Sequence, residues 1–222
     1  MHFLRCVLAE WAVLRPRLLR TRLGPWLLVL TAGLVWLGHR GADPATVALY
    51  AGAFGAVLSA AFGAGADADR AALIVTLTHP TTPLAVAGGR WLAAVLPAAA
   101  LTFVCTVAVG GPPRVALGGI ATAGAVAGCA LPAVLALGNG AALALCCCLA
   151  VAGAAPPEQL VGLAQPGLAR LAAASALELG PALWRYREVA EGAPGAMLHA
   201  AAWSALGVVV AGGLVARRMR AR

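Results

Sequence analysis

Long apolar stretches dominate the chain, and polar residues interrupt them only briefly. The stretches are rich in Ala, Leu and Val, and they are continuous rather than alternating with a period of two, which favours helices over barrel strands. Within a bilayer only helices and closed barrels satisfy their own backbone hydrogen bonds. We therefore expect an all-α polytopic membrane protein in which each long apolar stretch is a transmembrane helix.

Six transmembrane helices follow from the positions of the polar interruptions. The stretch 115–155 carries no charged residue and has 41 residues. As a single helix it would measure about 60 Å, twice the thickness of a bilayer core of about 30 Å. Gly138-Asn139-Gly140 is the turn signal near its middle, so we divide the stretch there. The other predicted spans are 23–38, 45–65, 91–109 and 196–216.

The first 22 residues predict an amphipathic helix that lies in the membrane surface. Its apolar residues recur every three or four positions, and charged residues such as Arg5, Glu10 and Arg15 lie largely away from that stripe. We expect Pro16 to end or kink this helix. The membrane-facing stripe consists of Phe3, Leu4, Val7, Leu8, Trp11 and Leu14.

Composition supports one membrane domain over residues 1–222. Hydrophobic residues make up 62% of the chain and charged residues 11%, against about 25% charged in a typical soluble domain. Two longer polar regions remain, at 67–83 and 156–195. We expect 67–83 to be a loop with a short helix and 156–195 to contain partial helices.

The distribution of charge predicts contact with anionic lipids and the orientation of the chain in the membrane. The net charge is +8 and all sixteen basic residues are Arg, gathered towards the two ends of the chain beside apolar spans. That distribution suits anionic lipid headgroups rather than nucleic acid. With six spans, eleven Arg lie on the side of the termini and five on the other. The positive-inside rule then predicts cytoplasmic termini, a cytoplasmic 67–83 loop and an external 156–195 region in a multi-pass plasma or inner membrane protein.

Catalytic constellations are missing from the sequence. The predicted spans hold almost no titratable group, with His199 at the edge of the last one, which argues against an ion-coupled carrier and against an intramembrane enzyme. Ser59 and Ser204 have no base nearby in sequence, so we interpret them as helix-packing hydroxyls. No phosphate-binding G-x-x-x-x-G-K-[ST] loop is present. We expect no ATPase site, no metal and no resident cofactor on this chain.

The six cysteines predict packing rather than metal binding. None has the C-x-x-C spacing of a metal finger or a redox motif, and all lie in apolar surroundings, where Cys behaves as a small hydrophobe. Three consecutive helical residues point about 100° apart and cannot share one ion. The cysteines are Cys6, Cys105, Cys129, Cys146, Cys147 and Cys148.

The loop 67–83 is the most informative segment. Asp67 and Asp69 open it, as expected at a helix N-terminus. Leu73 and Leu77 are one helical turn apart on one face, and residues 78–83 end the helix. Such a helix either docks its apolar ridge in the groove of a partner or lies on the membrane as a connector.

The same loop resembles that of the permeases of type-2 ABC exporters (ABC-2 type), which reads E-R-E-x-G-T-L-E-x-L-L-x-x-P with a G-K pair ten residues beyond the Pro. Asp69 falls on the third acidic position and Pro80 on the proline. Leu73 and Leu77 fall on the two leucines, and Gly89-Arg90 on the G-K pair at the start of the third span. The sequence also departs from the pattern, with Ala71 in place of the Gly, Ile74 in place of a Glu and Thr76 in place of a Leu.

This resemblance implies the function of the loop and the partners of the chain. The loop would be a coupling helix seated on a separate ABC ATP-binding subunit, which carries the ATP. The permease would pair with a second one as a homodimer or a heterodimer. The chain is also loosely similar to the haem-export-type permeases of cytochrome c maturation. The contacting residues would be Asp69, Arg70, Leu73, Leu77, His79 and Pro80.

Two further classes of function stay open. A structural or assembly membrane protein that moves nothing would equally suit Gly124-x-x-x-Gly128, because small residues let helices approach closely. An intramembrane enzyme is the third, against which the missing titratable groups argue. The uncharged spans are compatible with lipids, drugs, haem or apolar peptides as cargo.

Overall fold

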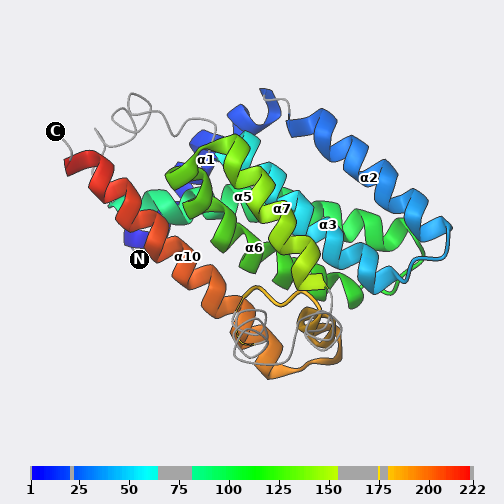
Figure 1. Ribbon diagram of the computed structural model, residues 1–222. Coiled ribbons are helices and arrows are strands. Elements are labelled where there is room, and N and C mark those ends of the chain that lie inside the picture. The colour runs from blue at the N-terminus through cyan, green and yellow to red at the C-terminus, as the bar shows by residue number, and fades with distance from the viewer. Residues whose placement is uncertain (1, 21–22, 65–81, 155–174, 176–179, 221–222) are drawn as a thin grey trace.

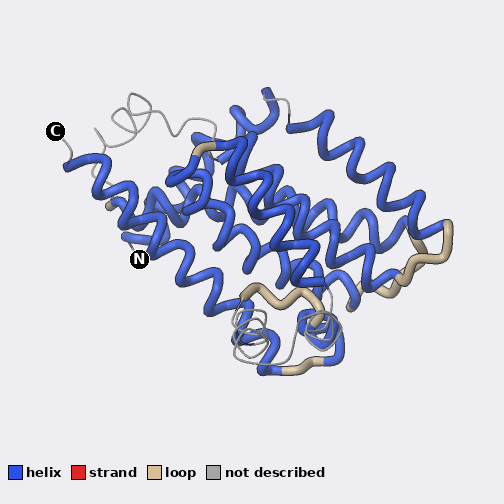
Figure 2. Tube along the Cα trace, viewed as in Figure 1, coloured by secondary structure: helices blue, strands red, loops and turns tan. Residues whose placement is uncertain are grey.

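Apolar helices run back and forth between two ends of the computed structural model (Figures 1 and 2). The structure describes residues 2–20, 23–64, 82–154, 175 and 180–220. Every regular element in these ranges is helical, which confirms the all-α prediction for this part of the chain. In chain order the elements are α1 (His2–Arg20), α2 (Leu23–His39), α3 (Pro44–Leu58), the π-helix η1 (Ser59–Ala64), α5 (Pro83–Ala108), α6 (Val115–Leu137), α7 (Asn139–Ala154), the 3-10 helix η2 (Arg185–Glu191) and α10 (Pro194–Arg220).

Four helices within the described ranges are long and apolar enough to cross a membrane. They are Pro44–Gly63, Pro83–Ala108, Val115–Leu137 and Pro194–Arg218. The helices α2 and α7 are apolar but shorter, with 17 and 16 residues, or about 25 Å each. The helices therefore indicate a membrane protein, and four of the six predicted spans reach the length of a spanning helix.

Local sequence signals explain where several helices begin and end. Gly138 has φ +81°, a value that favours glycine, and it separates α6 from α7 as predicted. The helix α5 begins at Pro83, eight residues before the predicted start at Trp91, because Thr82 caps it by accepting a hydrogen bond of 3.2 Å from the Ala85 amide. This earlier start places Arg90 inside the helix.

Pro16 and Pro25 both lie within helices. Pro16 does not end the first helix, because α1 continues to Arg20. Within a helix, proline removes only its own amide hydrogen bond, and the remaining turns can continue beyond it. Pro25 lies in the first turn of α2, where the amide has no helical partner in any case.

Contacts between distant segments define the two ends of the bundle. At the end we call the terminal end, Arg218 near the close of α10 donates a hydrogen bond to the Leu135 carbonyl of α6, and α1 packs on the first turns of α5. At the opposite end, the turn end, Gly111 contacts Pro44 and η2 contacts α3. Figure 1 shows both chain termini at the same end.

Close glycine contacts hold the centre of the bundle together. At Gly52 of α3 an added Cβ would overlap the backbone of Gly119 in α6. At Gly207 of α10 it would overlap the backbone of Gly128, also in α6. Helix association in lipid depends on such close packing, because lipid is as apolar as the side chains themselves. Glycine thus positions α6 between α3 and α10.

Candidate functional site

The predicted coupling helix lies outside the described residues. Its candidate contacts Asp69, Arg70, Leu73, Leu77, His79 and Pro80 all belong to the segment 65–81. Whether that segment docks on a partner or lies on the membrane is therefore left as a prediction. The described residues that follow it are Thr82 and the first turns of α5, where the predicted Gly89-Arg90 pair is found.

Gly88 and Gly89 form a seat for α1 on the first turns of α5. A Cβ added at Gly89 would lie 2.6 Å from Glu10 Cβ and 3.0 Å from the Val7 carbonyl oxygen. At Gly88 it would lie 3.2 Å from Val7 Cγ2. Real Cβ atoms do not approach that closely, so only glycine at position 89 lets the two helices touch. We call Val7, Glu10, Gly88, Gly89 and Arg90 the α1 seat.

A buried ion pair closes the α1 seat. Arg90 Nε lies 3.8 Å from Glu10 Oε1, and the side chains are 1% and 5% exposed. Isolated buried charges are very costly, so each charge stabilises the other here. The prediction that Glu10 lies away from the packed stripe is wrong. Glu10 follows Val7 by three residues and shares its face, and Arg90 supplies the counter-charge that permits burial.

The apolar stripe of α1 divides between two environments. Val7 is 5% exposed and Trp11 packs against the main core, whereas Phe3, Leu4 and Leu8 are about half exposed or more. The Leu14 side chain lies outside the described side chains. One part of the stripe thus faces the bundle, and the other part is free to contact lipid.

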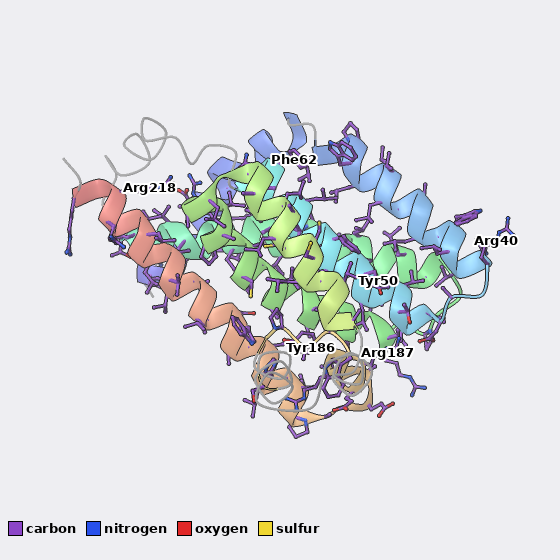
Figure 3. All side chains as sticks on the ribbon, in the orientation of Figure 1. Arg40, Tyr50, Phe62, Tyr186, Arg187 and Arg218 are labelled. Carbon is purple, nitrogen blue, oxygen red and sulfur yellow. The ribbon has the colours of Figure 1, made fainter. Side chains whose placement is uncertain are left out.

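At the turn end, η2 joins α10 and α3 through polar side chains (Figure 3). Tyr186 is fully buried, and its hydroxyl lies 3.0 Å from His199 Nδ1 on α10. Arg187 Nη2 donates a hydrogen bond of 2.5 Å to Thr46 Oγ1, and Nη1 lies 3.8 Å from Asp43 Oδ2. Sequence reasoning missed this cluster, although Tyr186 and Val189 already showed helical spacing.

Burial controls the acidity of Tyr186. Loss of solvent raises the pKa of its hydroxyl above the ordinary value of 10.0. The Cys129 thiol adds to the rise, and the Arg185 guanidinium partly opposes it. Tyr186 therefore stays protonated at neutral pH and can take part in the hydrogen bond to His199.

Two apolar grooves open on the surface of the bundle. One, which we call the α2 groove, lies between α2, α3 and α7 and has a volume of about 570 Å³. The other, of about 330 Å³, lies between α5, α6, α10 and η2. In its lining Trp91 Nε1 donates a hydrogen bond of 3.1 Å to the Gly124 carbonyl. The second groove is lined by Trp91, Val95, Leu117, Ile120, Ala121, Gly124, Val189, Met197, Ala200, Ala201 and Ser204.

The two serines singled out in the sequence differ in their contacts. Ser204 donates its hydroxyl hydrogen to the Ala200 carbonyl at 2.8 Å, as a helix-packing serine does. Ser59 is buried at the start of η1, with no hydrogen-bond partner among the described residues. Within those residues no three His, Cys, Asp or Glu side chains come together as metal ligands.

Comparison of the chain with family models, with curated proteins and with solved structures finds no match. The α1 seat and the packing of the apolar helices around α5 are the features that bear on function.

Proposed function

We propose that this chain is the membrane-spanning permease subunit of an ATP-driven exporter and that a separate ATP-binding subunit energises it. The observation that carries the proposal is the α1 seat. It joins a surface helix to the first turns of α5, directly after the segment 65–81, through a buried ion pair of 3.8 Å. A force applied to that segment would act on α1 and α5 together.

The packing of α5 supports a role in transmitting such a force. This helix contacts α3 at Gly55, where an added Cβ would lie 3.1 Å from Ala98 Cα, and it contacts α6 through the Trp91–Gly124 hydrogen bond. Interiors packed this closely move as units rather than deforming smoothly. In our proposal, ATP binding and hydrolysis in the partner move α1, α5 and the helices packed on α5, which are α3 and α6, together as one unit.

A non-transporting assembly protein remains the alternative, and the Gly124-x-x-x-Gly128 motif suits both functions because small residues let helices approach closely. An added Cβ at Gly124 would lie 3.0 Å from Ser204 Oγ, and one at Gly128 would meet the Trp203 carbonyl. Both glycines are thus used in packing α6 against α10 of the same chain.

The test is a pull-down of the ATP-binding subunit that co-purifies with the wild-type chain. Replacing both Leu73→Asp and Leu77→Asp should abolish retention. Each buried Leu contributes about 1.5–3 kcal/mol, and burial of an unpaired carboxylate adds a further cost. A total of about 4 kcal/mol lowers affinity nearly a thousandfold.

The matched control is Ala71→Asp with Val75→Asp, which has the same charge and spacing on the opposite face of the helix predicted from the sequence. It should retain the partner, and detergent gel filtration should show intact protein for both variants. The purified chain alone should not hydrolyse ATP, because it lacks a phosphate-binding loop. Wild-type retention by the Leu73/Leu77 variant would show that the segment is a connector only.

A further inference from the structure

The α2 groove is open at the surface, and its lining from α2, α3 and α7 is apolar. Its lining is apolar apart from the Tyr50 hydroxyl, and the rings of Tyr50 and Phe54 stack at 5.8 Å to form one wall. A Cβ added at Gly33 would meet no atom within 4 Å, so the groove is open at that position. The lining residues are Val29, Leu30, Gly33, Leu34, Trp36, Leu37, Tyr50, Phe54 and Val151.

A guanidinium group stands at the mouth of this groove. Trp36 lines the groove, and the Arg40 guanidinium carbon lies 5.2 Å from the centroid of the Trp36 ring. Arg40 is exposed in the turn that follows α2, and Figure 3 shows it at the far end of that helix. Trp36 therefore contacts the Arg40 guanidinium and also forms part of the lining of the α2 groove.

The charge of Arg40 is available to an external anion. Asp43, the carboxylate nearest to it in sequence, lies 3.8 Å from Arg187 Nη1. The contact shown for the Arg40 side chain, within the described part of the chain, is with the Trp36 ring. A guanidinium stacked on an aromatic ring keeps its N–H donors directed outward, where they can bind a phosphate.

We propose that the α2 groove binds an anionic phospholipid of the surrounding membrane, with an acyl chain along Gly33 and the phosphate on Arg40. The exposed Arg40 guanidinium on the Trp36 ring favours this occupant, because an anionic headgroup complements its charge while the acyl chain packs on the apolar lining. This inference is independent of the exporter proposal.

Native mass spectrometry of the detergent-purified chain tests the site, with phosphatidylglycerol and phosphatidylcholine as competing probes. Wild type should retain phosphatidylglycerol preferentially. Arg40→Gln should bind it about fivefold more weakly, as expected for the loss of one basic residue near a headgroup. Gly33→Leu should fill the groove and reduce retention of both lipids without disturbing the fold, because position 33 has open space.

Two matched variants separate the site from general effects. Arg114→Gln removes an exposed Arg away from the groove lining, and Gly24→Leu adds a side chain where a Cβ also meets nothing, outside the groove. Both should bind lipid as wild type does. Equal retention of the two lipids by wild type would overturn the proposal. So would variants at Arg40 and Gly33 that change the oligomeric state while lipid retention stays constant, because the groove would then be an interface between copies.

Discussion

At the scale of single residues, Glu10 and Arg90 are the side chains whose placement needs the most explanation. Each carries a charge that water solvates well, yet both are almost completely removed from solvent. Removing one partner of such a pair leaves the other charge buried, whereas replacing both by apolar residues is often neutral. The pair therefore fixes where α1 docks more than it raises overall stability.

Arg90→Met should destabilise the protein by about 3–5 kcal/mol, because the buried Glu10 carboxylate loses the Arg90 charge beside it. The double variant Glu10→Met with Arg90→Met should recover most of that loss. Thermal unfolding in detergent measures both. Arg114→Met, at an exposed position, is the control and should change stability by no more than about 0.5 kcal/mol. Wild-type stability of Arg90→Met would contradict the assignment of a buried ion pair.

Tyr186 should give the protein a specific sensitivity to alkali. Burial raises the pKa of the Tyr186 hydroxyl in the folded state above 10.0, so the unfolded chain ionises first as pH rises. The stabilisation is complete below pH 10 and falls above it. Stability of Tyr186→Phe measured between pH 9 and 11 should decline less steeply than that of wild type. Parallel declines would show that Tyr186 ionises equally in both states.

At the scale of elements, backbone contacts through glycine decide how helices cross. The helices α3 and α10 meet α6 at Gly119 and Gly128, and the facing residues on those helices are Gly52 and Gly207. Dispersion forces weaken steeply with distance, so close approach of backbones gives each pair many contacts. A methyl group added at such a crossing would overlap backbone atoms of the facing helix.

Gly207→Ala should therefore destabilise the protein, because its Cβ would overlap the backbone of Gly128. Overpacking of this kind costs about 1–3 kcal/mol, or roughly 3–10 °C in melting temperature for a chain of this size. Gly213→Ala on the same helix is the matched control, since a Cβ there meets nothing within 4 Å. It should melt at or above the wild-type temperature. Equal melting of both variants would rule out a tight crossing at Gly207.

At the scale of the whole molecule, charged and polar groups lie at the two ends of the bundle, the terminal end and the turn end. The terminal end carries α1 and the last turns of α10 with Arg217, Arg218 and Arg220. The turn end carries Arg40, Arg114 and η2, where acidic residues such as Asp43 accompany the arginines. The excess of positive charge at the terminal end underlies the predicted cytoplasmic location of both termini.

Cysteine-accessibility labelling tests this orientation in a cysteine-free background. A Cys introduced at position 187 should react with an impermeant maleimide added from outside intact cells, and a Cys introduced at position 220 should react only after the cells are opened. Reaction of position 187 from the cytoplasmic side alone would reverse the topology. Detergent gel filtration of each variant controls for folding.

Sequence by itself determined the helical class, the membrane environment and the division at Gly138. Hydropathy, helix length and glycine turns depend on residues that are close in sequence, so they can be predicted without knowledge of the tertiary contacts. The sequence also predicted a first helix, which the structure shows over His2–Arg20. The coupling helix stays a prediction, because residues 65–81 lie outside the described part of the chain.

Only the tertiary structure decided that Glu10 is buried on Arg90, 80 positions away, and that Tyr186 pairs with His199. It also decided that α2, α3 and α7 line an open groove that includes Trp36, whose ring Arg40 contacts. These features depend on which faces of distant helices come together. The spacing of apolar residues shows that a helix face is buried, but it does not show which other helix packs on that face. That helix is determined by glycines that permit close approach and by a side chain of opposite charge on the facing helix.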